Sequence, residues 1–214
     1  MKTLIRVLLL SLGVAQAPVL LAAGDAKAGE TLVVTCLACH GPAGNSTTPN
    51  FPKLAGQGEK YLLKQIKEIK AGVRAVPEMT GILVSFSDAD LANMAAYFAS
   101  QSMQLSGSKE MTVQVNSGEK VDALTLGAKV FRAGNAASGV PACTGCHSPK
   151  GSGNAPAGYP RLGGQHAAYI EKQLKDWRAG NRTNDGDSKP MRQAAQLMSD
   201  AEITAVANFI AGLN

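Results

Sequence analysis

Two copies of one short motif contain every cysteine of this chain. Residues 36–40 are CLACH and residues 143–147 are CTGCH, so both copies have the form Cys-x-x-Cys-His. The 214-residue sequence has four cysteines and three histidines, and the motifs use all of the former and two of the latter. A duplication this complete excludes chance, so the fold must serve a chemistry that needs two thiols and one imidazole together.

Three chemistries use closely spaced cysteines. A redox-active disulfide usually follows a strand and would leave the histidine without a role. A single zinc ion bound by both cysteine pairs would also leave both histidines unused. Covalent haem attachment uses every residue, because the thiols form thioethers to the macrocycle and the next imidazole binds the iron. The motifs therefore predict two haem c groups, attached through Cys36, Cys39, Cys143 and Cys146, with His40 and His147 as iron ligands.

The sequence around the motifs is also duplicated. Residues 50–74, NFPKLAGQGEKYLLKQIKEIKAGVR, match residues 158–182, GYPRLGGQHAAYIEKQLKDWRAGNR. Further on, SDADLANMAAYFAS at 87–100 matches SDAEITAVANFIAG at 199–212. The repeat predicts two homologous domains, 23–102 and 121–214, joined by a polar linker at 103–120.

Each predicted domain has a helical pattern. A short helix is expected before each motif, at 26–37 and 124–133, and apolar residues follow at helical spacing. Ser87 and Ser199 are suitable N-caps for the closing helices. The intervening segments are rich in Gly, Pro, Asn and Ser, so short helices alone bury little core. We therefore predict an all-α fold of two homologous domains in tandem, each wrapped around a covalent haem.

The number and positions of the histidines and methionines limit the candidates for the second axial ligand of each iron. The first domain has no histidine besides His40, and methionine is the common alternative. Met79 lies eight residues before Ser87, and Met191 lies eight residues before Ser199. These equivalent positions, expected in loops, predict Met79 and Met191 as the axial ligands.

Other candidate ligands fit worse. Met94 is equivalent to Val206 and Met198 to Phe86, so both are expected in the core, where methionine is common. His166 could replace Met191 as a ligand, but it is equivalent to Gly58 and precedes a helix. A histidine on the surface or near a haem propionate is the favoured interpretation.

The first residues have the pattern of an export signal. Residues 1–22 combine Lys2 and Arg6 with an apolar run and small residues, which predicts a signal peptide and a periplasmic protein. A retained membrane anchor is the alternative, but Gly13, Gln16 and Pro18 interrupt the run. Removal of the signal leaves 19 basic against 16 acidic residues, a balance too mild to indicate nucleic-acid binding.

Taken with their flanks, the motifs resemble the cytochrome c4 family of dihaem proteins, which implies that the two predicted domains are class I cytochrome c domains in tandem. The resemblance covers nearly the whole mature chain through both CxxCH motifs, NFPKLAGQ, YPRLGGQ, EMTG and NDGDSKPM. It implies that the carbonyls of Pro52 and Pro160 accept a hydrogen bond from the haem-binding histidines. It also implies that the haem propionates lie near the domain interface. A buried carboxylate needs donors or a cation, and the candidate propionate contacts are Tyr61, Tyr169, Arg74, Arg182 and Trp177.

Two irons with complete ligand sets indicate an electron carrier and not an enzyme. The family resemblance implies a periplasmic shuttle between a quinol-oxidising complex and a haem–copper terminal oxidase. We expect a monomer with redox-protein partners, no nucleic acid, and at most peripheral membrane association. A dihaem peroxidase would need an open haem and a longer chain. The other alternative is the haem-bearing subunit of a larger dehydrogenase, such as a flavocytochrome c.

Overall fold

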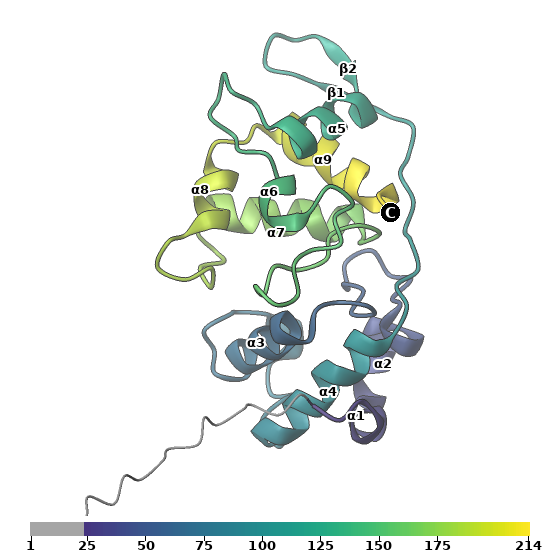
Figure 1. The fold of residues 1–214 in the computed structure, drawn as a ribbon. Helices are drawn as coiled ribbons and strands as arrows, with labels where there is room; N and C mark the ends of the chain where they lie inside the picture. The colour runs from purple at the N-terminus through teal and green to yellow at the C-terminus, as the bar shows by residue number, and fades with distance from the viewer. Residues whose placement is uncertain (1–23) are drawn as a thin grey trace, which may run out of the picture.

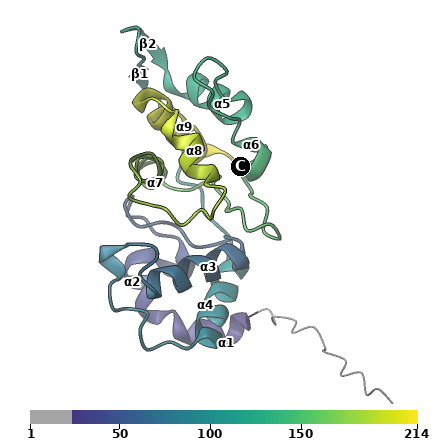
Figure 2. The ribbon, with the colours of Figure 1, turned by 90° about the vertical axis from the view of Figure 1, so that its left-hand side faces the viewer.

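The structure is a computed structural model that describes residues 24–214, so the predicted signal peptide lies outside the described residues. Two helical halves stack on one another, α1–α4 below and α5–α9 above, and the connecting chain runs along one side (Figures 1 and 2). Within residues 24–214, no helix has the length and apolarity needed to cross a membrane.

The first domain begins with a helix that ends earlier than expected. Asp25 caps α1 by accepting hydrogen bonds from two backbone N–H groups, but α1 stops at Leu32 and the chain continues as a 3-10 turn. The β-branched run Val33–Thr35 disfavours a longer helix. The elements in order are α1 (Ala26–Leu32), η1 (Val34–Cys36), α2 (Leu37–His40), η2 (Pro42–Gly44), α3 (Glu59–Lys70), η3 (Pro77–Met79) and α4 (Asp88–Ser100).

The second domain repeats this plan. Its elements are α5 (Ala123–Ala133), α6 (Thr144–His147), α7 (Ala167–Ala179), α8 (Pro190–Gln196) and α9 (Asp200–Gly212). Both closing helices start with the expected capping box, Ser87 with Asp90 in α4 and Ser199 with Glu202 in α9. Each box satisfies backbone donors that the first turn of a helix leaves free.

The connecting segment is more ordered than a plain linker. Strands β1 (Thr112–Gln114) and β2 (Lys120–Asp122) form an antiparallel hairpin, with Val113 opposite Val121. Val113 is buried against Ala123, Ala201 and Ala205 of the second domain. This hairpin was not part of the predicted all-α fold, and its alternating Val113 and Val115 favour an extended conformation.

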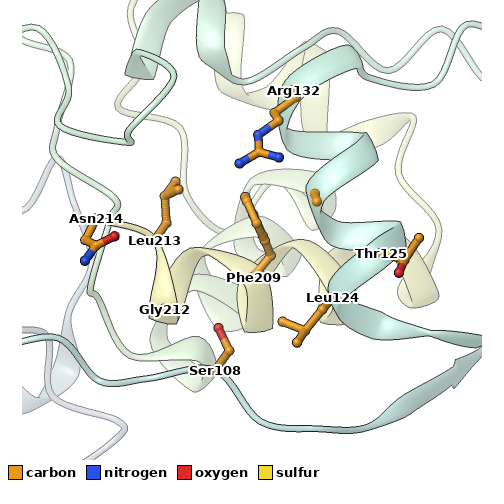
Figure 3. A pocket seen from close by; sticks show the side chains of 9 residues that line it. Ser108, Leu124, Thr125, Arg132, Phe209, Gly212, Leu213 and Asn214 are labelled. Atoms are coloured by element: carbon orange, nitrogen blue, oxygen red, sulfur yellow. The ribbon is translucent and has the colours of Figure 1, made fainter.

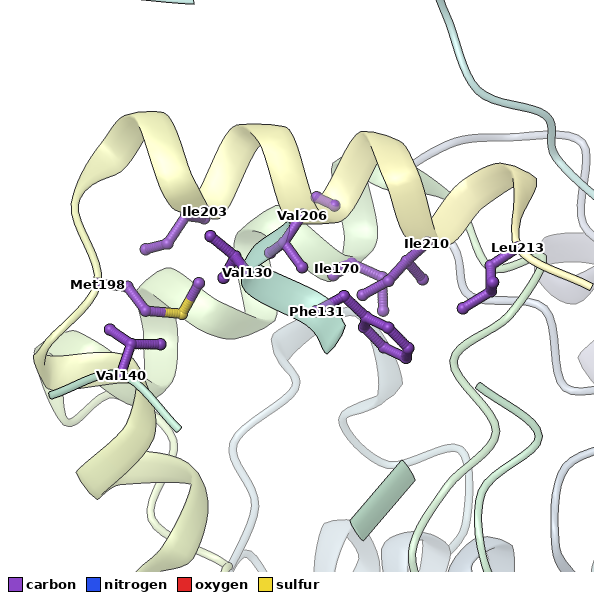
Figure 4. Packing of buried hydrophobic residues seen from close by; sticks show 10 residues of the cluster. Val130, Phe131, Val140, Ile170, Met198, Ile203, Val206, Ile210 and Leu213 are labelled. Carbon is purple, nitrogen blue, oxygen red and sulfur yellow. The ribbon is translucent and has the colours of Figure 1, made fainter. Parts of the chain in front are cut away.

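Each domain has its own apolar core at the crossing of its first and last long helices. In the second domain, α9 lays Ile203, Val206 and Ile210 onto Phe131 of α5 (Figure 4). The equivalent core of the first domain includes Leu91, Met94 and Phe98 of α4. Met94 and Met198 are both buried in these clusters, as predicted.

The two helix crossings depend on glycine. A Cβ on Gly29 in α1 would lie 2.1 Å from the carbonyl oxygen of Asn93, and one on Gly127 in α5 would lie 2.2 Å from that of Ala205. Asn93 and Ala205 are equivalent positions of the repeat. Both domains therefore use a glycine to let their first and last helices approach closely.

Candidate haem sites and the domain interface

Each Cys-x-x-Cys-His motif forms a one-turn helix with its histidine at the end. His40 closes α2 and His147 closes α6, and both imidazoles are buried. Cys39 and Cys146 are exposed on these turns, whereas Cys36 and Cys143 are half-buried. The two motifs thus present their thiols and imidazoles in the same arrangement.

A backbone carbonyl fixes each imidazole. The Nδ1 of His40 lies 2.8 Å from the carbonyl oxygen of Pro52, and the Nδ1 of His147 lies 3.0 Å from that of Pro160. These are the hydrogen bonds that the family resemblance implied. Because a carbonyl can only accept, Nδ1 carries the proton and Nε2 has its lone pair free for a metal. No residue of the described chain hydrogen-bonds either Nε2.

The acid–base properties of these groups suit iron ligation. Burial lowers the pKa of His40 and of His147, and the proline carbonyls only partly oppose this effect. Both imidazoles are therefore neutral at pH 7, which is the form that binds metals.

The thiols do not have the properties of a redox dithiol. Burial raises the pKa of Cys36, and it raises the pKa of Cys143 to about 11. A redox-active Cys-x-x-Cys needs a lowered thiol pKa. All four cysteines are free, and no three metal-binding side chains converge among residues 24–214. The disulfide and single-zinc interpretations are therefore not supported.

The predicted axial methionines lie in equivalent but differently folded segments. Met79 ends the 3-10 turn η3 and packs against the core of the first domain. Met191 lies in the first turn of α8, because Pro190 starts a helix where a loop was expected. Both side chains are half-buried. Their role as axial ligands stays a prediction.

A cluster of buried polar side chains joins α3 to α7 at the domain interface. The guanidinium of Arg74 donates to Gln65 at 2.8 Å and to Gln173 at 3.0 Å. That of Arg182 donates to the same two oxygens, at 2.9 Å and 2.6 Å. Two like charges from different domains therefore share two acceptors, the side-chain oxygens of Gln65 and Gln173.

The aromatic residues predicted near the propionates complete this cluster. Arg74 donates to the hydroxyl of Tyr169 at 3.0 Å, and Arg182 donates to that of Tyr61 at 3.3 Å. The guanidinium of Arg182 also lies over the Trp177 ring, 4.3 Å from its centroid. Burial alone would raise the pKa of Tyr61, but the two guanidinium groups outweigh it and lower that pKa.

The charges of these two arginines indicate whether the interface suits a haem group with its two carboxylates. Neither Arg74 nor Arg182 forms an ion pair with any carboxylate of residues 24–214, although Arg182 is only 9% exposed. Glu68 reaches the cluster only through Asn184 and at longer range, and two adjacent, largely buried cations without a direct ion pair are unfavourable. Haem propionates would supply the missing carboxylates, so the donor set of the interface fits this cofactor.

His166 links the second domain to the first domain and to the linker. Its Nε2 lies 2.8 Å from the carbonyl oxygen of Ser46, and its Nδ1 lies 2.9 Å from the hydroxyl of Ser106. Both nitrogens are therefore used in bonds to the first domain and to the linker. His166 is therefore buried between the domains and not on the surface, and both of its nitrogens are engaged. A position beside a haem propionate stays a prediction.

Further interface residues carry no sequence signal of their role. Gln57 and Gln165 belong to the repeat, yet nothing in the local pattern indicates that each binds the backbone of the opposite domain. Their equivalence under the repeat is the one signal that could have suggested reciprocal contacts.

A hollow of about 520 Å³ lies on the second domain, away from the motifs. Side chains of Leu124, Arg132 and Phe209 line it, between α5, α9 and the linker (Figure 3). None of the predicted ligands contributes to it.

The fold and the two sites define the class: a c-type cytochrome with two tandem domains. The cytochrome c family model matches residues 26–102 and 124–214. Cytochrome c4 of Pseudomonas aeruginosa is 54% identical over 193 residues, covering 90% of each chain. The structure of reduced cytochrome c4 from Pseudomonas stutzeri has a TM-score of 0.82 and 51% identity, covering 90% of this chain and all of that one. A thiosulfate dehydrogenase electron acceptor of Thiomonas intermedia is 34% identical over 178 residues, covering 83% and 77%.

The chain belongs to the cytochrome c4 family. It is a dihaem electron-transfer protein with two covalently bound haem c groups, and a carrier rather than an enzyme. The predictions of fold class, cofactors and carrier role are thereby confirmed.

Proposed function

We propose that this protein is a periplasmic shuttle that accepts electrons from a quinol-oxidising complex and delivers them to a haem–copper terminal oxidase. The paired arrangement of the two sites carries the proposal, because each domain repeats the same histidine geometry and one polar cluster joins the domains. Two linked carriers can hold the two electrons of one quinol.

The residues proposed to hold each iron are His40 with Met79, and His147 with Met191. When bound, the haem supplies a one-electron change of the iron, and the protein sets its potential and access. A histidine and a methionine on opposite sides leave no position for a substrate or an exogenous ligand. The protein then needs to rearrange little between its two oxidation states.

We assign the arginine cluster to the propionates. Arg74 and Arg182 already occupy the domain interface and lack carboxylate partners within the described chain. Binding one or more propionates there would balance their charge and bring the acidic edges of the haems toward each other. This assignment gives the interface a role in electron exchange between the domains.

Partner docking is proposed to be weak and dependent on charge. The basic excess lies in the second half, where residues 103–214 carry twelve basic and nine acidic residues. Such local patches orient an encounter without giving high affinity. Export by the signal at 1–22 would place the carrier beside membrane-bound partners, as a monomer in peripheral contact with the membrane.

Reconstitution tests this pathway. Purified holoprotein is added to membrane vesicles that contain a quinol-oxidising complex and a haem–copper oxidase, and oxygen uptake from quinol is measured. The proposal expects uptake to rise with added protein and to fall at high ionic strength. It fails if the vesicles neither reduce nor oxidise the protein.

A second candidate role is electron acceptor for a dehydrogenase. The similarity to the thiosulfate dehydrogenase electron acceptor of Thiomonas intermedia favours it. Mixing the oxidised protein with such a dehydrogenase and thiosulfate distinguishes the two roles. Fast reduction in this mixture, without reduction by the quinol-oxidising complex, would replace the first proposal by the second.

A further inference from the structure

A glutamine from the opposite domain holds the backbone beside each haem-binding histidine. The side chain of Gln165 accepts a hydrogen bond from the N–H of Lys53 at 2.9 Å and donates to the carbonyl of Lys53 at 2.8 Å. Gln57 does the same for Arg161, accepting at 3.0 Å and donating at 2.6 Å. Both glutamines are buried, at 2% and 5% exposure.

The held peptide group is the one that orients the imidazole. The N–H of Lys53 and the carbonyl of Pro52 belong to a single peptide unit, and that carbonyl accepts from His40. A continuous chain of hydrogen bonds therefore runs from the imidazole through one peptide to Gln165 in the other domain.

The same chain exists in the opposite direction. His147 donates to the carbonyl of Pro160, whose peptide N–H belongs to Arg161 and donates to Gln57. The two chains are equivalent under the sequence repeat. Each domain thus supports the histidine of its neighbour, and neither domain supports its own in this way.

Hydrogen bonds in series strengthen one another. A peptide whose N–H donates to glutamine has a more negative carbonyl oxygen, which pulls harder on the imidazole proton. The imidazole becomes more basic, and a more basic ligand favours ferric over ferrous iron. The potential of the haem should therefore fall when the chain is complete.

We propose that Gln165 and Gln57 are positioning residues that lower the potential of the haem in the opposite domain. The inference rests on the proposed axial roles of His40 and His147. It makes the two potentials dependent on domain docking, because separating the domains breaks both chains and raises both potentials. A partner that loosens or tightens the interface would then change the driving force of electron transfer.

Matched substitutions test the crossed assignment. Gln165→Met and Gln57→Met keep the side-chain length and remove both hydrogen bonds. Lys60→Met is the control, because the amino group of Lys60 donates across the interface to the carbonyl of Pro156, which no haem-binding histidine uses. Gln165→Glu keeps the acceptor oxygen and serves as the conservative variant. Midpoint potentials and the NMR signals of the imidazole Nδ1 protons in the ferrous holoprotein are measured.

The proposal expects a crossed pattern. Gln165→Met raises the potential of the first haem and moves the His40 Nδ1 proton upfield, while His147 is unchanged; Gln57→Met does the reverse. Lys60→Met changes neither, and Gln165→Glu does not raise the first potential. Equal shifts of both haems, a shift in the domain that carries the substitution, or no shift would overturn the proposal. Wild-type spectra without haem-shifted imidazole signals from His40 and His147 would instead disprove the axial assignment.

Discussion

At the residue scale, each iron site depends on which nitrogen of an imidazole is protonated. The carbonyls of Pro52 and Pro160 fix the proton on Nδ1 of His40 and His147, and burial keeps both rings neutral. The methionine side chains have no such restraint from the described residues. They are therefore the ligands whose loss should be easiest to detect without disturbing the fold.

Replacement of Met79 by Ala should leave a vacant coordination position at the iron of one haem only. We expect the ferrous protein to bind carbon monoxide at one haem per chain and to lose about half of its methionine-to-ferric-iron absorption band. Optical titration with carbon monoxide measures both effects. Met94→Leu is the control, since Met94 lies in the core and its replacement should cost less than about 1.5 kcal/mol. Carbon monoxide binding by neither or both haems of the Met79 variant would contradict the assignment.

At the element scale, the closest contact in each domain is the crossing of its first and last long helices. Gly29 and Gly127 allow this approach, with no space for a Cβ against a carbonyl oxygen of the partner helix. Because the obstacle is backbone and not a flexible side chain, the helices must shift to accept any other residue.

Gly127→Ala should therefore destabilise the second domain. The overpacking cost is about 1–3 kcal/mol, partly offset by the better helix propensity of alanine. Denaturant unfolding of the holoprotein measures the change. Lys129→Ala is the control, because Lys129 lies in the same helix with its side chain exposed. Equal stability of the two variants would show that the crossing tolerates a Cβ.

Those features of the elements that depend on a few neighbouring residues could be predicted from the sequence. The capping boxes at Ser87 and Ser199 and the repeat identified the helices and the equivalent ligands, because caps and periodicity act over a few residues. The hairpin at Val113 and the helix that starts at Pro190 have local signals too, alternating valines and a proline at the first helical position, but these signals are short and occur in many loops. The contacts of Gln57 and Gln165 depend on how two domains meet, which no local pattern specifies.

At the scale of the whole molecule, the interface is polar and nearly symmetric. Tyrosine and glutamine side chains of α3 and α7 accept hydrogen bonds from Arg74 and Arg182, which follow these helices, and His166 links the second domain to Ser46 and Ser106. The stability of such a polar interface depends on the protonation of its groups and on the charges that balance them. Both effects can be measured.

Acid should weaken the interface through His166. Burial first, and then the nearby Lys53 amino group, lower the pKa of His166 against the opposing effect of the Ser46 carbonyl. Below about pH 6.5, the usual histidine pKa, the unfolded chain binds a proton that the folded chain resists. Stability should thus fall as the pH drops from 7 towards the lowered pKa.

Denaturant unfolding between pH 7.5 and 5 measures this loss. The control is His166→Gln, which keeps a donor for the carbonyl of Ser46 and cannot titrate. The variant should lose less stability than the wild type over this range. Parallel curves for the two proteins would assign the acid sensitivity to other groups.

The arginine cluster should set both potentials together. Arg182→Gln removes a buried positive charge from the interface, which favours the ferric state, so both midpoint potentials should fall. Spectroelectrochemistry measures them. Arg178→Gln is the control, because Arg178 pairs at the surface with Asp200. If the midpoint potentials fell in the Arg178→Gln control but not in Arg182→Gln, the propionates would not lie at the arginine cluster.

The absorption spectrum of the exported holoprotein tests the central claim most directly. Ferric, ferrous and ferrous-plus-carbon-monoxide spectra are recorded, together with the haem content per chain. We predict two covalent haems, a methionine-to-ferric-iron band and no change with carbon monoxide, as closed His40–Met79 and His147–Met191 sites require. A clear carbon monoxide shift in the wild-type protein would contradict the account, because an open iron belongs to a catalyst or to a different ligand set.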